Sequence, residues 1–459
     1  MSNKKFTLFV CNCGSSSLSC QVYTCEGGAA RTLVSSVSCK AHRVGTKSTE
    51  PSFIEYTLHG WTAPDGRATF RDESMPVIAS HADAVAAMLR QLVALGVHID
   101  VVGHRFVHGG ALFPDNTVIT PDVHAKLVQC LPLATIHNPN SLCLFTVIFT
   151  FLSLSLLLLL LTLLSRKRTW TAVIDFCDKF FKEREHPVVQ YIVFDTAFHK
   201  LAPEAYTYAL NHQVAQEHGY RKFGFHGLSY QYVVETLQHH GIAGAGAGQC
   251  RRIVACHLGT GGSSAAGIRD GVTVDTTMGW SPLPGLVMST RAGDIDASIV
   301  LDLIDHGWTT AQVTRLLNNQ SGLVGLTDGV TSDLRDVHRL AHTPDSPAQA
   351  RCALTYDVYV HRLVGAIGAL VALMGGVDAI VFTDDLGFNM PALRQSVCER
   401  LAWLGVELDP SANTPTTKGA GLLAASDTAL LSTPQSRVKV FAVVNDEEII
   451  IAREVFRFV

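Results

Sequence analysis

The sequence predicts a two-domain α/β protein, from its length, its alternating strand and helix patterns, and the glycine-rich turns that end several strands. At 459 residues the chain is too long for one hydrophobic core, so two domains are expected. Strand-like runs lead into glycines in IDVVGHRFVHGG, RRIVACHLGTGGSS and VDAIVFTDDLGFN. In alternating α/β architectures, ligands gather at the carboxyl ends of strands, where backbone amides can bind them.

The order of the elements follows from hydrophobic spacing. Buried-strand and alternating patterns predict two antiparallel strands at the start, and helical spacing that ends at a glycine predicts the first helix. The same reasoning predicts a long helix late in the chain and a final strand and helix. The expected elements are strands at 6–10 and 18–23, a helix at 81–96, a strand within 99–110, a helix at 354–374, a strand at 438–444 and a helix at 445–456.

Composition narrows the class of function. Hydrophobic residues make up 47% of the chain, charged residues 17%, and the formal net charge is -4. This balance argues against a nucleic-acid-binding surface and favours a small substrate. The 12 cysteines are scattered and form no C-x-x-C pair, so we expect small buried thiols. Without an N-terminal signal peptide, the sequence predicts a cytoplasmic protein.

Two glycine-rich turns could hold an anion. Asn12-x-Gly14-Ser15-Ser16-Ser17 and the segment from His257 to Ser264 (HLGTGGSS) each follow a strand. Small side chains let the backbone approach phosphate oxygens, while amides and hydroxyls donate to them. Taken alone, each turn is more often a plain loop than an anion site.

Phosphoryl transfer also needs positive charge, because negative charge spreads over the equatorial oxygens. Arg105 and Arg291 lie in glycine-flanked, weakly charged surroundings, although without further context structural salt bridges are the favoured explanation. Four further candidates are ambiguous because a single His beside aromatics is usually a core residue: His137, Asp195, His199 and His226.

The ordered set of motifs is more specific than any one of them. The chain contains N-x-G-S-S-S, G-H-R-x-V-H-G-G, H-N-P, F-D-T-A-F-H, G-F-H-G, H-L-G-x-G, V-D-T-x-M-G, G-L-V-M-x-T-R-x-G-D-I-D, S-D-x-R-D and D-E-E-x-x-I-A-R. In content and order this set resembles the acetate kinases (acetokinase family) of the sugar kinase, heat-shock protein 70 and actin superfamily. The resemblance implies two ribonuclease H-like domains hinged about a nucleotide cleft, with 1–195 plus 449–459 as the N-terminal domain and 196–448 as the nucleotide-binding domain.

The resemblance also assigns roles to residues. Arg105 and Arg291 would hold acetate and the phosphoryl group, with His137 in the same cleft. His226 and Arg291 would stabilise the transition state, and Asp195 would support the site. Asn12 and Glu447 match the magnesium positions. The nucleotide-binding positions would be Ser15, Ser17, His257, Gly259, Gly261, Asp333, Arg335, Gly387 and Asn389.

These roles imply the reaction of ATP with acetate to give acetyl phosphate and ADP. Mg²⁺, or Mn²⁺ in its place, would assist as a hard cation that prefers oxygen ligands. A carboxylate is already a nucleophile, so positioning and charge neutralisation can supply most of the catalysis. The resemblance implies a homodimer, and neither nucleic acid nor a membrane is expected as a partner.

Three departures from the family pattern leave alternatives open. Ser19 stands where a lysine is usual, Thr260 where an asparagine is usual, and Asp384-Asp385 replace small residues of a G-G-I-G-E-N-type adenosine loop. Two carboxylates beside a polyphosphate add bulk and repulsion. The chain could therefore use pyrophosphate in place of ATP, or be a catalytically dead homologue that binds a ligand or partner. A propionate or other short-chain carboxylate kinase is a further alternative, because one methylene changes binding by only about 1–3 kcal/mol.

An apolar segment interrupts the pattern at about 142–169. Its uncharged run, Cys143 to Leu164, has the length and the basic flank of a membrane span. A span here would place the flanking motifs IHNPN and YIVFDTAFH on opposite sides of a bilayer, although both should face one aqueous site. Phe, Leu and Ser are encoded by pyrimidine-rich codons, so we interpret the segment first as a retained intron in a eukaryotic gene. A surface insertion ranks second and a membrane anchor last.

Overall fold

The computed structural model describes residues 5–14, 17–26, 32–44, 51–60, 66–134, 138–142, 188–414 and 427–459. The chain divides into two compact units: unit 1 is Met1–Ala197 with Glu447–Val459, and unit 2 is Phe198–Asp446. The predicted boundary of 448/449 lies two residues later, so the structure assigns Glu447 and Glu448 to unit 1. Ser15, His137 and residues 143–169 of the predicted insert lie outside the described residues.

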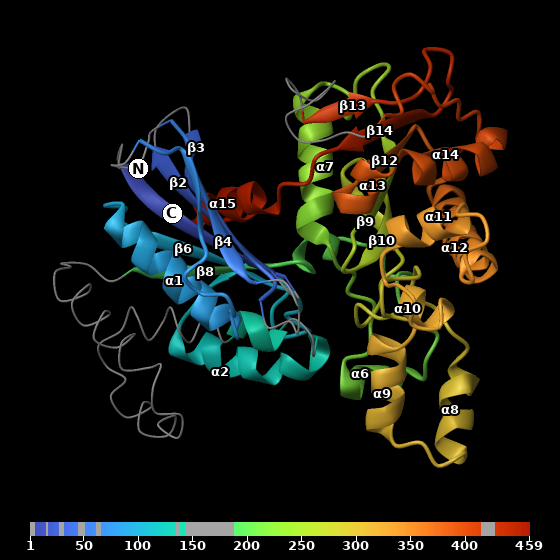
Figure 1. Ribbon diagram of the computed structural model, residues 1–459, viewed down its shortest axis with the longest axis horizontal. Helices are drawn as coiled ribbons and strands as arrows, with labels where there is room; N and C mark the ends of the chain where they lie inside the picture. The colour runs from blue at the N-terminus through green and yellow to red at the C-terminus, as the bar shows by residue number, and fades with distance from the viewer. Residues whose placement is uncertain are drawn as a thin grey trace. The chain divides into compact units, whose positions relative to one another are not determined.

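Unit 1 is built on one mixed sheet with the order β5-β4-β3-β2-β1-β6-β8-β7 (Figure 1). The first five strands pair antiparallel in chain order, whereas β6 runs parallel to β1 and β8 runs parallel to β6. The strands are β1 (Lys5–Cys13), β2 (Ser17–Glu26), β3 (Thr32–His42), β4 (Phe53–Leu58), β5 (Thr69–Asp72), β6 (Val101–Phe106), β7 (Thr117–Val118) and β8 (Val189–Phe194).

Alternating side chains of β1 and β6 pack against helices on the two faces of this sheet. Phe9 and Val102 belong to the buried cluster that includes the apolar side of α1 (His81–Ala94). On the other face, a Cβ added at Gly103 would lie 2.9 Å from Val455 of α15 (Glu447–Phe458). Since real Cβ atoms do not approach that closely, Gly103 lets α15 pack directly on the strand. The remaining helices of unit 1 are α2 (Pro121–Gln129) and the short 3₁₀ helix Leu131–Ala134.

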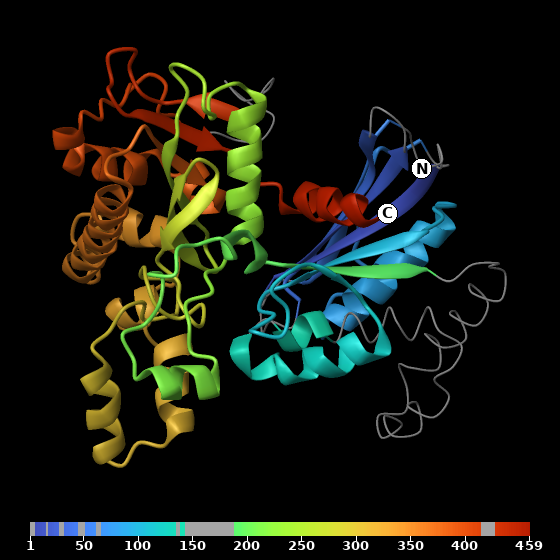
Figure 2. The ribbon, with the colours of Figure 1, turned by 180° about the vertical axis from the view of Figure 1, so that it is seen from behind.

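Unit 2 contains a six-stranded sheet with the order β11-β10-β9-β12-β14-β13 (Figure 2). β9, β10 and β11 pair antiparallel, and β12 and β14 continue parallel to β9 on its other side. The strands are β9 (Arg252–Leu258), β10 (Ser263–Arg269), β11 (Val272–Thr276), β12 (Ala379–Thr383), β13 (Thr428–Leu430) and β14 (Lys439–Val443).

Both units therefore repeat one plan, in which three antiparallel strands are followed by two parallel strands on the far side of the first strand. This is the ribonuclease H-like arrangement that the resemblance implies, so the predicted fold class is confirmed. The sequence shows no visible internal repeat, because the plan constrains hydrophobic alternation and not residue identity.

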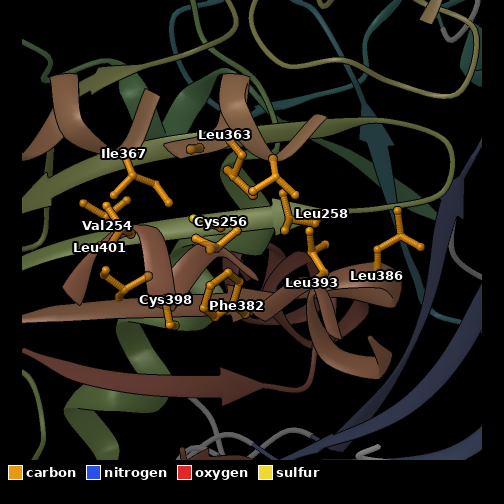
Figure 3. Close-up of a cluster of buried hydrophobic side chains, with 14 of the residues drawn as sticks. Val254, Cys256, Leu258, Leu363, Ile367, Phe382, Leu386, Leu393, Cys398 and Leu401 are labelled. Carbon is orange, nitrogen blue, oxygen red and sulfur yellow. The ribbon is translucent and has the colours of Figure 1, made fainter. Parts of the chain in front are cut away.

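The core of unit 2 lies between its sheet and the long helix α12 (Gln349–Met374). Val254, Cys256 and Phe382 point from β9 and β12 toward Leu363 and Ile367 of α12 (Figure 3). α12 has the length and apolar composition of a membrane span. A core helix passes the same test, and the buried residues of α12 belong to the core of unit 2. The other helices are α6 (His212–His218), α7 (Gly227–His239), α8 (Ala297–Asp305), α9 (Thr310–Asn319), α10 (Gly322–Leu326), α11 (Leu334–Ala341), α13 (Asp384–Asn389) and α14 (Pro391–Arg400), with 3₁₀ turns at Ala197–His199 and Ala402–Leu404.

Two local predictions can be compared directly with the structure. The segment Asp384–Asn389, predicted as a loop, is the short helix α13, which starts immediately after β12. All ten cysteines in the described part of the chain are buried and unbridged. The expectation of small buried thiols is thus confirmed for those cysteines.

Candidate active site

The carboxyl ends of three parallel strands bring polar residues together in unit 1. Asn12 is near the end of β1, Arg105 near the end of β6, and Asp195 follows β8 directly. Because β1, β6 and β8 are neighbours in the sheet, these residues meet at one edge. The sheet topology thus assembles a cluster from motifs up to 183 positions apart in the sequence.

Arg105 is held in one orientation by a bidentate ion pair. Its Nε donates to Oδ1 of Asp195 at 2.7 Å and its Nη2 donates to Oδ2 at 2.6 Å. Asp195 is fully buried. Burial alone would lower the pKa of Arg105, but Asp195 and then Glu447 outweigh it and raise the pKa above its ordinary value. Arg105 is therefore a fixed, permanently charged group.

Two glutamates at the start of α15 complete this cluster. Nη1 of Arg105 lies 3.2 Å from Oε2 of Glu447 and donates to Oδ1 of Asn12 at 2.9 Å. The Asn12 amide nitrogen donates to Glu447 and to Glu448, each at 3.1 Å. Asp195 and Glu447 thus share the Arg105 guanidinium, and Glu448 contacts the same Asn12 amide. Carboxylate oxygens are ligands that a hard divalent cation prefers.

The predicted metal pair is adjacent, but its geometry imposes a condition. The Asn12 oxygen accepts from Arg105 while its nitrogen faces the carboxylates. To offer oxygen to a cation beside Glu447, the amide would have to turn over. Within the described part of the chain, no group of three or more His, Cys, Asp or Glu residues could hold a metal ion alone. Mg²⁺ commonly binds through one or two protein oxygens together with water and substrate phosphates.

In unit 2, a glycine loop joins β9 to β10 and passes directly beside Arg291. A Cβ added at Gly262 would lie 2.6 Å from Nη2 of Arg291 and 3.7 Å from Nε2 of His226. A side chain there would displace the guanidinium, so the loop needs glycine at this position. The structure therefore brings Arg291, His226 and the predicted phosphate loop together.

Arg291 is a buried cation that carboxylates do not compensate. Only 6% of its surface is exposed. Its head group donates to the backbone oxygens of Pro282 (2.7 Å) and Gly261 (2.8 Å), with no carboxylate partner among the described residues. Burial lowers the pKa of Arg291 to about 10. An anion bound at this point would relieve the cost of burying the charge.

His226 is held by a hydroxyl relay. It precedes α7 with a φ of 56°, in the left-handed region. The Oγ of Ser264 lies 2.7 Å from Nδ1 of His226 and 2.5 Å from the hydroxyl of Tyr230. Burial raises the pKa of Tyr230, so this phenol stays protonated. The contact at Nδ1 fixes the ring so that Nε2 faces the side of Gly262.

His257 lies next to this relay. Its ring stacks on that of His226 at 4.0 Å between centroids. The Nδ1 of His257 lies 2.9 Å from Oγ of Ser229, and its Nε2 lies 3.4 Å from Oδ2 of Asp384. His257 near the end of β9, Asp384 just after β12 and His226 just before α7 therefore place two imidazoles and a carboxylate near the start of the glycine loop.

The residues predicted to contact the nucleoside gather around Asp385. Arg335 forms a bidentate contact with Asp333, with distances of 3.0 and 2.6 Å, and its Nη1 lies 3.2 Å from Asp385. Thr260 donates to Asp385 at 2.5 Å, and Asn389 donates to it at 3.1 Å. A carboxylate of the chain itself therefore occupies the centre of these donors.

Sequence reasoning missed three residues that position the site, Tyr230, Glu448 and Arg394, and included Ser264 only as the last residue of the glycine-rich turn. Arg394 is fully buried and donates to the backbone oxygens of Gly387 (3.0 Å) and Phe388 (2.5 Å), so it holds the end of α13. Glu448 stands in the D-E-E motif and was within reach of sequence reasoning, whereas the others reach the site only through folding. His199 is a core residue that contacts Thr273 and the Phe225 carbonyl.

Comparison with known proteins identifies the family. The sequence profile of the Acetokinase family matches residues 7–155 and 169–453. The chain belongs to this family. It is therefore a phosphotransferase with a carboxyl group as acceptor, and the resemblance drawn from the motifs is confirmed. Residues 156–168, between the matched stretches, fall inside the apolar segment predicted to be an insert.

Individual relatives agree with this assignment. The chain is 35% identical to the acetate kinase of Bacteroides fragilis, over 97% of this chain and 98% of that protein. The crystal structure of acetate kinase from Entamoeba histolytica matches with a TM-score of 0.73 and 34% identity, over 98% of this chain and 99% of the other. A propionate kinase from Francisella tularensis also matches with a TM-score of 0.73, at 28% identity, over 98% of each chain.

Proposed function

We propose that this acetokinase-family chain is a magnesium-dependent acetate kinase that transfers a phosphoryl group reversibly between a phosphate donor and acetate. With ATP as donor, a carboxylate oxygen of acetate forms a bond to the γ-phosphorus while the bond from that phosphorus to the bridging oxygen of ADP breaks. The products are acetyl phosphate and ADP, and no proton has to be removed from the nucleophile. The family and the relatives' names support the acceptor class, and similarity to a propionate kinase keeps propionate as the alternative acceptor.

The observation that carries the proposal is the uncompensated charge of Arg291. A cation buried to 94% is costly unless a bound anion offsets it. Arg291 is beside a glycine loop and close to His226, so the anion that fits is a phosphoryl group with oxygens to accept from both. Arg291 and His226 would neutralise the charge that builds on the equatorial oxygens during transfer.

The acceptor would bind in unit 1. Arg105 is fixed by Asp195 and remains charged, so it would orient the acetate carboxylate. Orientation is the main requirement, because the nucleophile needs no activation. The role of His137, which lies outside the described residues, stays a prediction.

Asn12 and Glu447 would hold Mg²⁺, with Mn²⁺ as a substitute. The carboxylate oxygens of this cluster are ligands of the kind that a hard divalent ion prefers, which supports this assignment. When bound, the ion would neutralise donor phosphate oxygens. Arg105, Asp195 and Glu448 would keep the two ligands in place.

A homodimer is supported by the surface of α8. This helix contains Ile299, Leu301 and Ile304, which are 50%, 63% and 40% exposed, and has no buried residue. Exposed aliphatic side chains on one helix are typical of an interface. Light scattering should give twice the chain mass for the full chain and the single mass for Leu301→Lys, with Leu354→Lys as an exposed control. A monomer in both cases would contradict dimerisation through α8.

We also propose that the protein is cytoplasmic, acts without a membrane, and is encoded without the segment at 142–169. The gap in the family match at 156–168 supports the last point. Transcript sequencing across codons 138–172 should show a message that lacks the segment. A message that keeps it in frame would contradict the retained-intron interpretation.

Acyl phosphate trapped as a hydroxamate tests the proposed function. The full chain, given Mg²⁺, a donor and either acetate or propionate, should produce a hydroxamate that Arg291→Ala does not. A higher kcat/KM with propionate would change the assigned acceptor. Folded protein that yields no hydroxamate with either acid and any donor would favour the catalytically dead homologue.

A further inference from the structure

Asp384 adopts a backbone conformation that favours glycine. It directly follows β12 and has a φ of 64°, which costs a non-glycine residue about 1 kcal/mol or more. Its carboxylate covers the α-carbon of Gly259, because a Cβ built there would overlap Oδ2 of Asp384. The aspartate thus occupies space at the start of the glycine loop despite a strained backbone.

The position of this carboxylate is set from several sides. His257 lies 3.4 Å from Oδ2, and the amide of Asn445 donates to Oδ1 at 3.4 Å. Behind it, Leu386 of α13 lies in the same buried cluster as Leu258 and Leu393 (Figure 3). The chain cannot move α13 away without uncovering this part of the core.

Asp385 acts as an internal anion one residue later. Thr260, Asn389 and Arg335 all direct hydrogen-bond donors at its carboxylate, at 2.5, 3.1 and 3.2 Å. Arg335 also pairs with Asp333, so one guanidinium is shared by two carboxylates. Little positive charge remains here for a ligand phosphate.

The surroundings of Arg291 and those of Asp385 differ in solvent exposure, and this difference affects which donor can bind. Arg291 is buried, whereas the side chains of Asp385 and Arg335 are 37% and 47% exposed. A donor whose terminal phosphoryl group contacts Arg291 would run along the glycine loop toward Asp384 and Asp385. Any group attached beyond the second phosphate would therefore meet the two carboxylates.

We propose that Asp384 and Asp385 determine the phosphoryl donor, by excluding nucleoside-bearing donors and admitting a short inorganic polyphosphate, of which pyrophosphate is the simplest. This proposal rests on the proposed function of the same site. An acetate oxygen would bond to one phosphorus of pyrophosphate while its bond to the bridging oxygen breaks, and orthophosphate would leave. Acetate and HP₂O₇³⁻ give acetyl phosphate and HPO₄²⁻, so charge and protons balance.

Calorimetric titration of the full chain with Mg-ATP and with Mg-pyrophosphate tests the proposal independently of turnover. The double variant Asp384→Gly/Asp385→Gly should bind ATP at least about tenfold more tightly than the unaltered chain, while pyrophosphate affinity changes by less than about threefold. Asp385→Asn, which keeps the size and removes the charge, should give a smaller gain. Asp345→Gly is the matched control, because Asp345 also has a left-handed φ of 58° but lies in an exposed loop.

Equal ATP affinity in the unaltered chain and the double variant would overturn the proposal, as would a gain in Asp345→Gly of the same size. Turnover then separates it from the proposed function. If the unaltered chain forms acetyl phosphate from ATP with the same kcat/KM as the double variant, the donor assignment is overturned and the proposed kinase function stands. Tighter ATP binding in the double variant, without acyl phosphate from any donor, would support the exclusion of nucleoside-bearing ligands by the two carboxylates and contradict the kinase.

Discussion

Replacing Arg291 or Arg105 by methionine should have different effects on stability, because backbone oxygens accept from Arg291 whereas a buried ion pair fixes Arg105. Arg291→Met removes a charge whose pKa burial lowers from its ordinary value to about 10. That shift corresponds to a desolvation cost of about 3 kcal/mol, at about 1.4 kcal/mol per pKa unit. The substitution also removes the hydrogen bonds to Pro282 and Gly261, and each orphaned oxygen costs about 1–3 kcal/mol. Since these effects oppose each other, we expect the free energy of unfolding to change by no more than about 3 kcal/mol.

Arg105→Met should behave differently. It leaves Asp195 fully buried without its bidentate partner and removes a contact to Glu447. Breaking a buried ion pair by removing one partner costs about 3–5 kcal/mol. The free energy of unfolding should therefore fall by that amount.

Urea unfolding followed by circular dichroism provides both values, and each measurement should be repeated with saturating pyrophosphate. The ligand should raise the midpoint of the unaltered chain and leave that of Arg291→Met unchanged, because the buried cation is then absent. Equal destabilisation by the two substitutions, or ligand stabilisation retained in Arg291→Met, would refute the assignment of Arg291 as the phosphoryl-binding cation.

Three further predictions follow from the contacts described above. Ser264→Ala should lower kcat by about 10- to 100-fold with KM unchanged, because His226 loses the contact at Nδ1. The control is Ser263→Ala, because the Ser263 hydroxyl faces Tyr359 instead. Equal losses of kcat in the two variants would contradict the relay. Glu447→Gln should raise the Mg²⁺ concentration for half-maximal activity at least about tenfold, whereas Glu454→Gln farther along α15 should not, and an unchanged requirement would remove Glu447 from the metal site. Burial lowers the pKa of His104 and of His199 to about 4. As the pH falls from about 6.5 to 4, the unfolded chain therefore takes up protons before the folded chain, and the free energy of unfolding should decrease by up to about 3 kcal/mol for each His. A free energy of unfolding that does not change over this pH range, or a pH dependence that His199→Gln leaves unchanged, would contradict this.

Hydrophobic spacing was sufficient to predict the main elements of the fold. The runs at 6–10 and 18–23 became β1 and β2, and the helical spacing at 81–96 became α1. Pattern alone could not reveal that both units repeat one strand plan, because this depends on pairing between distant strands. Asp384–Asn389 was predicted as a loop, since six residues with a glycine carry little helical signal.

The candidate site was predictable in its charged residues and not in its supporting ones. Arg105 and Arg291 stand in recognisable motifs. Only the structure shows that the carboxylate of Asp195 pairs with Arg105, whereas backbone oxygens accept from Arg291. Ser264 lies in the predicted glycine-rich turn, but its contact with His226 depends on folding, and Arg394 carries no local signal for its role. The sequence did indicate that Asp384 and Asp385 depart from the family pattern, and the structure adds the groups that they contact.

Phosphorus-31 magnetic resonance of the full chain with acetate, Mg²⁺ and one donor at a time is the decisive measurement for transfer to acetate, because it identifies the product and the leaving group together. We expect an acetyl phosphate resonance that grows in step with orthophosphate from pyrophosphate, and no such resonance in Arg291→Ala. An acetyl phosphate signal that persists in Arg291→Ala, or donor hydrolysis without acetyl phosphate, would contradict transfer to a carboxylate through the buried cation.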